Sequence, residues 1–192
     1  MKKLLIGLSA LVLLLLSGCS WRSWLPPGPY SDALAKREYV SIYKKDCALN
    51  DGRGCYFLAY RYSMGYGVKR NKSKSVKYYS KACALNNGRG CSTLGKCFED
   101  GKCGLKKNIS KALIYYHKAC DLNYHAGCSI LGWRYLLGNN VKKDDAKAKM
   151  YLRKACDLGN TYSCLWHRRL SRGFKPIVLP HCQNIPTERQ SK

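Results

Sequence analysis

The sequence predicts an all-α fold, a solenoid of helix-turn-helix repeats joined by disulfides. The first observation behind this prediction is a series of cysteine pairs, each separated by eight residues, that recur at steps of 36, 37 and 36 residues. The second is that large apolar residues and glycines recur between the pairs with the same period and at helical spacing. Such a period indicates stacked repeats, each burying its apolar face against the next. The four pairs are Cys47–Cys55, Cys83–Cys91, Cys120–Cys128 and Cys156–Cys164.

Residues 1–18 are predicted to be a signal peptide. Lys2 and Lys3 precede an apolar stretch over residues 4–15, which is too short for a membrane-spanning helix. Residues 16–19, Leu-Ser-Gly-Cys, resemble the lipobox of bacterial lipoproteins, which implies that Cys19 becomes the diacylated N-terminus. Ser20 stands where lipoproteins of the inner membrane often carry Asp, so an outer-membrane protein facing the periplasm is expected. The alternative is an ordinary secreted protein.

A proline-rich segment over residues 19–30 follows, and we expect it to act as a stiff tether between the lipid anchor and the folded domain. The repeat domain is expected over residues 31–172, with a tail over 173–192. Within the domain we expect a half repeat at 31–46, full repeats at 47–82, 83–119 and 120–155, and a terminal helix at 156–172. The half repeat resembles the second of the two helices of a full repeat, because Tyr43 and Lys45 occupy the same positions as tyrosines and lysines of that helix in the later repeats.

Each full repeat contains two predicted helices, which we call A and B. Helix A follows the second cysteine of a pair, has apolar residues three and seven positions after it, and ends at a glycine suited to a C-terminal cap. Helix B begins at an Asn or Asp suited to an N-cap and ends in Lys-Ala-Cys. The capping residues are Gly65, Gly101 and Gly138 for helix A, and Asn71, Asn108 and Asp144 for helix B.

The first cysteine of each pair therefore ends a helix B, and the second begins the next helix A. A disulfide there closes a loop of about nine residues, which the loop-entropy model values at about 2.5 kcal/mol. Structural zinc sites space paired ligands two to four residues apart, so this spacing argues against metal, and we expect no metal and no cofactor.

Cys97 and Cys103 occur only in the second full repeat. We expect a fifth local disulfide, with a redox-active pair as the alternative, although their spacing is not the Cys-x-x-Cys of oxidoreductases. Cys182 then has no assigned partner, and its state is left open.

The repeating motif is Leu-Gly-x-x-Tyr-x-x-Gly followed by Lys-Ala-x-x-Tyr-Tyr-x-Lys-Ala. It resembles the SEL-like repeat, a relative of the tetratricopeptide repeat, and the disulfide in each repeat resembles the Helicobacter cysteine-rich protein family. The resemblance implies a right-handed α-solenoid that binds proteins or peptides on a concave face lined by helix A. His167 departs from the motif where a leucine is expected, and Pro176 and Pro180 replace a final helix B.

By this resemblance, ligand positions lie one, five and eight residues after the second cysteine of each pair, on one face of helix A. Varied aromatic and charged residues at these positions favour a specialised binding surface. Packing against the neighbouring repeat is the alternative, equally weighted for Tyr60 and Trp133. The predicted surface residues are Tyr56, Tyr60, Lys96, Glu99, Trp133, Leu136 and Arg169.

The chain is strongly basic, with 35 Lys and Arg against 11 Asp and Glu and a formal net charge of +24. Nucleic acid is the usual partner of so basic a chain, but an exported protein rarely meets it, so we expect none. Lysines that recur on helix B, such as Lys74 and Lys81, are expected to form a solvated face, with docking to an anionic surface as the alternative. Lipid phosphates, peptidoglycan carboxylates and acidic protein segments are candidate anionic partners.

The resemblance also implies a possible enzyme, because members of the cysteine-rich family have been described as penicillin-binding proteins with weak β-lactamase activity. Ser41 and Lys44 match Ser-x-x-Lys, but neither Ser-Asp-Asn nor Lys-Thr-Gly occurs, and no catalytic residue can be assigned. The sequence therefore favours a lipid-anchored scaffold that binds a protein, peptide or cell-envelope ligand. A peptidoglycan-derived or β-lactam ligand, and weak β-lactam hydrolysis, are the alternatives.

Overall fold

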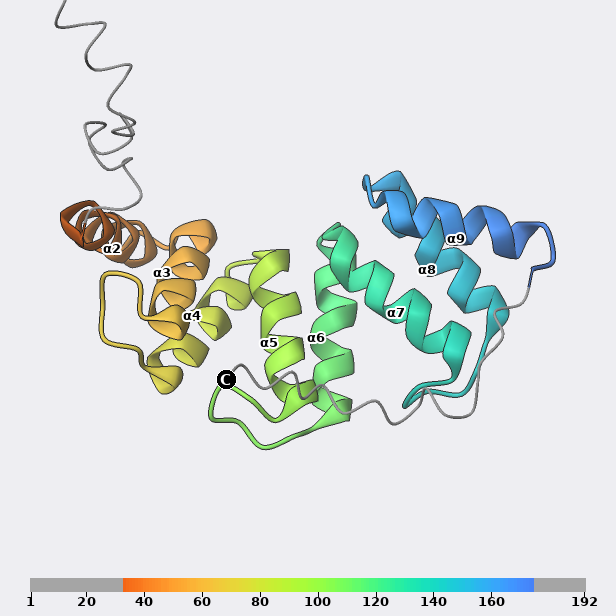
Figure 1. Cartoon of the computed structure of the whole chain (residues 1–192), viewed down its shortest axis with the longest axis horizontal. Helices are drawn as coiled ribbons and strands as arrows, with labels where there is room; N and C mark the ends of the chain where they lie inside the picture. Colours follow the sequence, from red (N-terminus) through yellow and green to blue (C-terminus); the bar gives the residue numbers. More distant parts are fainter. Residues whose placement is uncertain (1–32, 175–192) are drawn as a thin grey trace, which may run out of the picture.

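The structure, a computed structural model, describes residues 33–174, which form eight α-helices and no strand (Figure 1). The predicted signal peptide, Cys19, the predicted tether and Cys182 lie outside these residues. The predicted all-α class is confirmed. The helices are α2 (Ala33–Ala48), α3 (Gly52–Met64), α4 (Lys72–Ala84), α5 (Gly88–Asp100), α6 (Ile109–Asp121), α7 (His125–Leu137), α8 (Asp145–Asp157) and α9 (Thr161–Ser171).

The helices follow one another in a curved row from α2 to α9, as Figure 1 shows. Each helix packs against the next, so the chain builds successive helix-turn-helix units. The A helices are α3, α5, α7 and α9, and the B helices are α2, α4, α6 and α8. Helix α5 also contacts α3 and α7, whereas within residues 33–174 no B helix makes comparable contacts with the next B helix. The A helices therefore lie on the inner side of the curve.

The predicted helix caps are present. The side chains of Asn71, Asn108 and Asp144 accept hydrogen bonds from backbone amides three residues ahead, at 2.8, 2.9 and 2.9 Å. The glycines that end α3, α5 and α7 adopt left-handed conformations, with φ between 64° and 82°. A second set of caps, not predicted from the sequence, lies at the start of the A helices, where Asp51, Asn87 and Asn160 accept similar bonds.

Disulfides hold each helix B to the following helix A. The four predicted junction disulfides are present, and Cys97–Cys103 forms the fifth. The residue before the second cysteine is a glycine in the first three junctions, and the helices approach closely there. A Cβ atom added to Gly127 would lie 2.7 Å from Cβ of Ala119 and 2.8 Å from the amide nitrogen of Cys120. This spacing leaves no room for a side chain, so the glycine is required by packing.

Parallel aromatic pairs join helix A to helix B within each repeat. Phe98 of α5 stacks on Tyr115 of α6 with centroids 5.6 Å apart, and Lys111 lies over the Phe98 ring at 5.5 Å. The same trio recurs in the other two repeats, as Tyr62–Tyr78 with Lys74 and Tyr135–Tyr151 with Lys147. The recurring lysines at the start of helix B therefore pack on aromatic rings as well as facing solvent.

A buried ion pair links α5 to α7. Arg134 is 5% exposed and donates to the Glu99 carboxylate at 2.8 Å. The hydroxyl of Tyr116 on α6 donates to the same carboxylate oxygen at 2.5 Å. Burial and the neighbouring Glu99 raise the pKa of Tyr116 above its ordinary value, so the hydroxyl keeps its proton. Glu99 was predicted to face a ligand, but the structure engages its carboxylate in this inter-repeat contact.

We expect Gly127→Ala to destabilise the protein by about 1–3 kcal/mol, because the added methyl group overpacks the junction between α6 and α7. In an unstrained helix the same change would stabilise by about 1 kcal/mol. The midpoint of urea unfolding measures the effect. Ser110→Ala, at an exposed position of α6, is the control and should change stability by less than about 0.5 kcal/mol. A Gly127→Ala variant as stable as the parent would contradict the crowding.

Glu99→Leu should cost about 2–3 kcal/mol, because it leaves the Arg134 guanidinium buried without its carboxylate. The cost should lie at the low end for a buried pair, since the Glu99 side chain is 30% exposed. Adding Arg134→Leu should restore at least half of the loss. Chemical denaturation of both single variants and the double variant measures the coupling, and additive effects would show that the two residues do not interact.

Candidate functional site

A groove of about 690 Å³ lies between the first two repeats, on the side of the A helices. Helices α3 and α5 form its walls, α4 forms its floor, and the loop after α5 closes one end. Three of the predicted surface residues, Tyr56, Tyr60 and Lys96, line this groove. The structure thus brings together predicted positions from two neighbouring repeats.

Tyrosines from α3 provide the aromatic part of the groove. Tyr60 is 36% exposed, and its ring lies 6.0 Å from that of Tyr66. Tyr56 is more fixed, since its ring packs against Tyr79 at 5.7 Å and Arg89 lies over it at 5.5 Å. Tyr60 is therefore an accessible aromatic surface, and Tyr56 is part of the wall that supports it.

The floor of the groove carries two buried hydroxyl groups on α4. Ser75 is only 1% exposed, and its hydroxyl interacts with that of Tyr79. Tyr79 is 3% exposed, and burial raises its pKa to about 12, so its hydroxyl is protonated at neutral pH. Buried hydroxyls are normally hydrogen-bonded, and these two form a closed polar floor beneath the groove.

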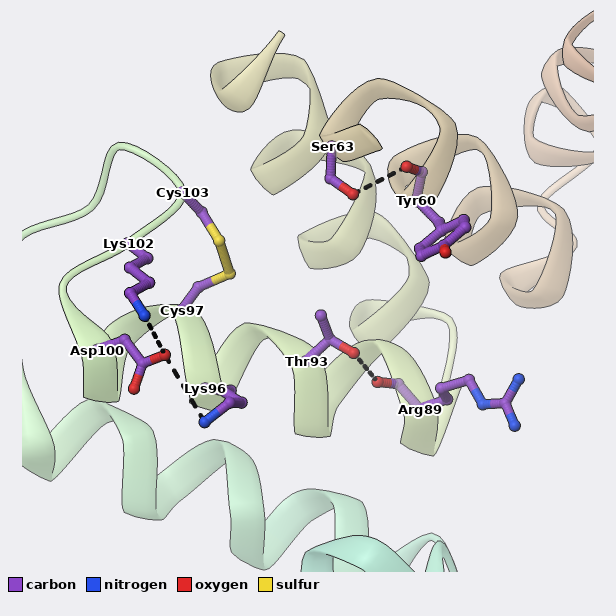
Figure 2. Close-up of a disulfide and its surroundings, with 9 residues drawn as sticks. All are labelled: Tyr60, Ser63, Arg89, Thr93, Lys96, Cys97, Asp100, Lys102 and Cys103. Carbon is purple, nitrogen blue, oxygen red and sulfur yellow. Dashed lines mark hydrogen bonds and ion pairs between the residues drawn. A yellow bond between two sulfur atoms is a disulfide. The ribbon is translucent and has the colours of Figure 1, made fainter. Parts of the chain in front are cut away.

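Basic residues gather at the end of the groove where the A helices terminate. Lys96 and Lys102 both pair with Asp100, at 3.6 and 3.5 Å, and both lysines remain about two-thirds exposed (Figure 2). Arg70 and Lys72 come from the turn before α4 and from its first residue, and neither pairs with a carboxylate within residues 33–174. Asp100 is the single acidic residue in the lining.

The Cys97–Cys103 disulfide forms part of the wall at the same end, joining α5 to the loop that follows it, as Figure 2 shows. Cys97 is buried and Cys103 half-buried. Cys103 also adopts a left-handed backbone conformation, with φ 61°. The disulfide therefore fixes the loop that carries Lys102. Redox activity of this pair stays a hypothesis.

The remaining predicted surface residues lie elsewhere. Trp133 is half-buried against Tyr162 and Trp166, with centroids 5.6 and 5.0 Å away, which agrees with the packing alternative. Arg169 is exposed and lies over the Trp166 ring at 5.4 Å. Leu136 has no exposed surface and packs in the core with Leu152 and Leu170, so its prediction as a surface residue is wrong.

Sequence analysis also missed residues that line the groove. It considered only helix A positions, whereas Arg70, Lys72 and Lys102 come from the connections between helices A and B and from the start of α4. Two of them, Lys72 and Lys102, could have been found in the sequence, because they differ in residue type from their counterparts in the other repeats. Lys72 stands where the second and third repeats have Ile109 and Asp145, and Lys102 stands where the first and third repeats have Tyr66 and Asn139.

The Ser-x-x-Lys match lies outside the groove, on α2. Ser41 and Lys44 are exposed, and the Ser41 hydroxyl donates to the backbone carbonyl of Glu38 at 2.7 Å. The described residues contain no cluster of three or more His, Cys, Asp or Glu side chains placed to hold a metal ion. They also contain no helix long and apolar enough to cross a bilayer.

Comparison with known proteins places the repeats in a family. The Sel1 repeat profile matches residues 52–87, 90–124 and 125–160, more than half of the chain. Each match begins at or just after the start of a helix A and continues past the end of helix B. Among curated protein sequences, no relative matches the chain.

Solved structures agree with this match. Helicobacter pylori cysteine rich protein B shares 39% identity, with a TM-score of 0.56, over 71% of this chain and 98% of its own. The Sel1 repeat protein from Oxalobacter formigenes superposes with a TM-score of 0.62 at 23% identity, over 67% of this chain and 96% of its own. A protective antigen of uropathogenic Escherichia coli with an SLR fold gives a TM-score of 0.60 at 23% identity, over 75% of this chain and 34% of its own. The chain belongs to the Sel1 repeat family.

Proposed function

We propose that this protein is an exported, lipid-anchored scaffold that binds a polypeptide segment of a partner protein in the groove between α3 and α5. The observation that carries the proposal is the groove itself. It combines an accessible Tyr60 ring with basic side chains, on walls held by disulfides. Accessible aromatic residues on a rigid surface are the usual anchors of protein interfaces.

The architecture favours an extended ligand. Solenoids present long concave surfaces because each repeat contributes the same helix face. Clamped junctions reduce the ordering cost of binding, since the walls do not have to reorganise. The β-lactamase alternative gains no support from the described residues, because Ser41 lies on α2 with its hydroxyl already bonded.

Export and anchoring complete the proposal. The five disulfides indicate an extracytoplasmic location, because such bonds persist in oxidising compartments. The signal peptide and the Leu-Ser-Gly-Cys motif support lipidation at Cys19. A diacylated cysteine and the proline-rich tether would hold the groove close to the membrane surface, where envelope proteins are available.

Selection from a displayed library of random peptides tests the groove as a polypeptide site. Peptides selected on the full chain should bind Tyr60→Ala about tenfold more weakly, because the exposed aromatic anchor is lost. Ser63→Leu should also weaken binding, since Ser63 lines the groove and a larger side chain fills it. Fluorescence anisotropy measures both effects.

Matched controls for this experiment are Ile114→Ala, an exposed apolar residue of α6, and Ser80→Leu, an exposed serine of α4. Both lie outside the groove lining and should leave the affinity within about twofold of the parent, as surface changes usually do. Selected peptides that bind both groove variants with the affinity of the parent would refute the proposed site.

Replacing Cys19 by Ser should abolish acylation, because the modified thioether sulfur is absent. Incorporation of an alkyne-labelled fatty acid in growing cells measures the modification, and membrane fractionation measures retention. Cys182→Ser is the control and should keep the label. Equal labelling of the Cys19→Ser variant and the parent would show that the predicted lipobox is not used.

A further inference from the structure

We propose that the groove selects an acidic segment, in which an apolar or aromatic side chain packs on Tyr60 and neighbouring Asp or Glu carboxylates lie at the basic end. This inference rests on the proposed function and adds the chemical class of the partner. It follows from how charge and apolar surface are distributed along the groove, and from which cations break the repeat pattern.

The two ends of the groove differ chemically. Tyr56 belongs to the first half of α3, whereas the cations gather where α3 and α5 end. There a Cβ atom added to Gly65 would lie 3.5 Å from Cβ of Arg70. One added to Gly104 would lie 3.9 Å from Cβ of Lys72, which places the loop after α5 beside the start of α4. Lys102 is two residues from Gly104, so the basic residues from two repeats meet at one end.

The charge at this end is largely uncompensated. The lining holds Arg70, Lys72, Lys96 and Lys102 against Asp100 alone, a difference of four positive and one negative, or +3. Lys96 and Lys102 share Asp100 at 3.6 and 3.5 Å and remain about two-thirds exposed, so their ammonium groups can turn to a ligand. Such a surface favours carboxylates and disfavours basic segments.

Two of these cations do not belong to the repeating scaffold. Arg70 has counterparts at Lys107 and Lys143, next to the helix B cap, and Lys96 has a counterpart at Arg169 of α9. Lys72 and Lys102 have no basic counterpart in the other full repeats. In the same register these repeats have Ile109 and Asp145 for Lys72, and Tyr66 and Asn139 for Lys102. The placement of Lys72 and Lys102 at one groove is thus particular to this interface and needs another explanation.

The composition of the selected peptides tests the inference on the full chain. Among peptides that lose affinity in Tyr60→Ala, Asp and Glu should be enriched next to an apolar residue. Replacing those acids by Asn and Gln should weaken binding about tenfold, since each partly exposed ion pair contributes a fewfold and two or more act together. The difference should shrink as salt is raised, because the charges are screened.

Charge reversal supplies the matched comparison. The double variant Lys72→Glu/Lys102→Glu should bind the acidic peptides about tenfold more weakly and bind their Asn and Gln versions with nearly unchanged affinity. The control Lys44→Glu/Lys77→Glu changes the net charge equally at exposed sites outside the groove, and it should change the affinity by less than about twofold. A new selection on the groove variant should enrich Lys and Arg.

Each of the other outcomes overturns either the acidic class of the ligand or the groove as a peptide site. Peptides that depend on Tyr60 but show no acidic enrichment, or that respond equally to both charge reversals, overturn the acidic class and leave the groove as a peptide site. Failure to find any peptide that depends on Tyr60 overturns the proposed function and the inference together. Phosphatidylglycerol vesicles that bind through Lys72 and Lys102 while acidic peptides do not would identify a lipid surface instead.

Discussion

The close approach of each helix B to the following helix A is the constraint on which the rest of the solenoid depends. At the junction between α6 and α7 a glycine faces Cβ of Ala119, and a disulfide closes the same turn. The glycine allows the approach, and the disulfide restricts the unfolded chain around it. Since the arrangement recurs, the angle between neighbouring units is set locally, and small rotations add up to the curved row of helices.

Sequence reasoning could predict whatever repeats, because repetition separates scaffold residues from the rest. The period located the helices, the caps at Asn71, Asn108 and Asp144, and the glycines at their ends. It could not place the residues that face the neighbouring repeat. Whether position eight of helix A points to solvent or to the next unit depends on helix rotation and curvature, which no spacing within one repeat encodes. Leu136 was assigned to the surface for this reason.

The same limit explains the missed basic residues. Lys102 lies in a connection between helices A and B, outside the helix face from which ligand positions were predicted, so only its departure from the repeat register marked it. Its position depends on the Cys97–Cys103 disulfide and on the contact of Gly104 with the start of α4. The disulfide lies within one repeat, whereas the approach of Gly104 to α4 joins two repeats and becomes visible only when the loop after α5 is seen beside α4.

The groove exists because one inter-repeat space is left unfilled. Three sets of equivalent residues occupy this space along the solenoid, each with one residue from a helix A, one from helix B and one from the next helix A. They are Ser63, Tyr79 and Cys97; Glu99, Tyr116 and Arg134; and Leu136, Leu152 and Leu170.

In the second set a long arginine and a glutamate close the space with an ion pair, and in the third set three leucines close it with apolar packing. In the first set Ser63 and Cys97 are too small to meet, and Cys97 is turned to Cys103 instead. All three residues of that set line the groove. The groove that we propose as the binding site is thus produced by two small side chains at positions where the other repeats carry large ones.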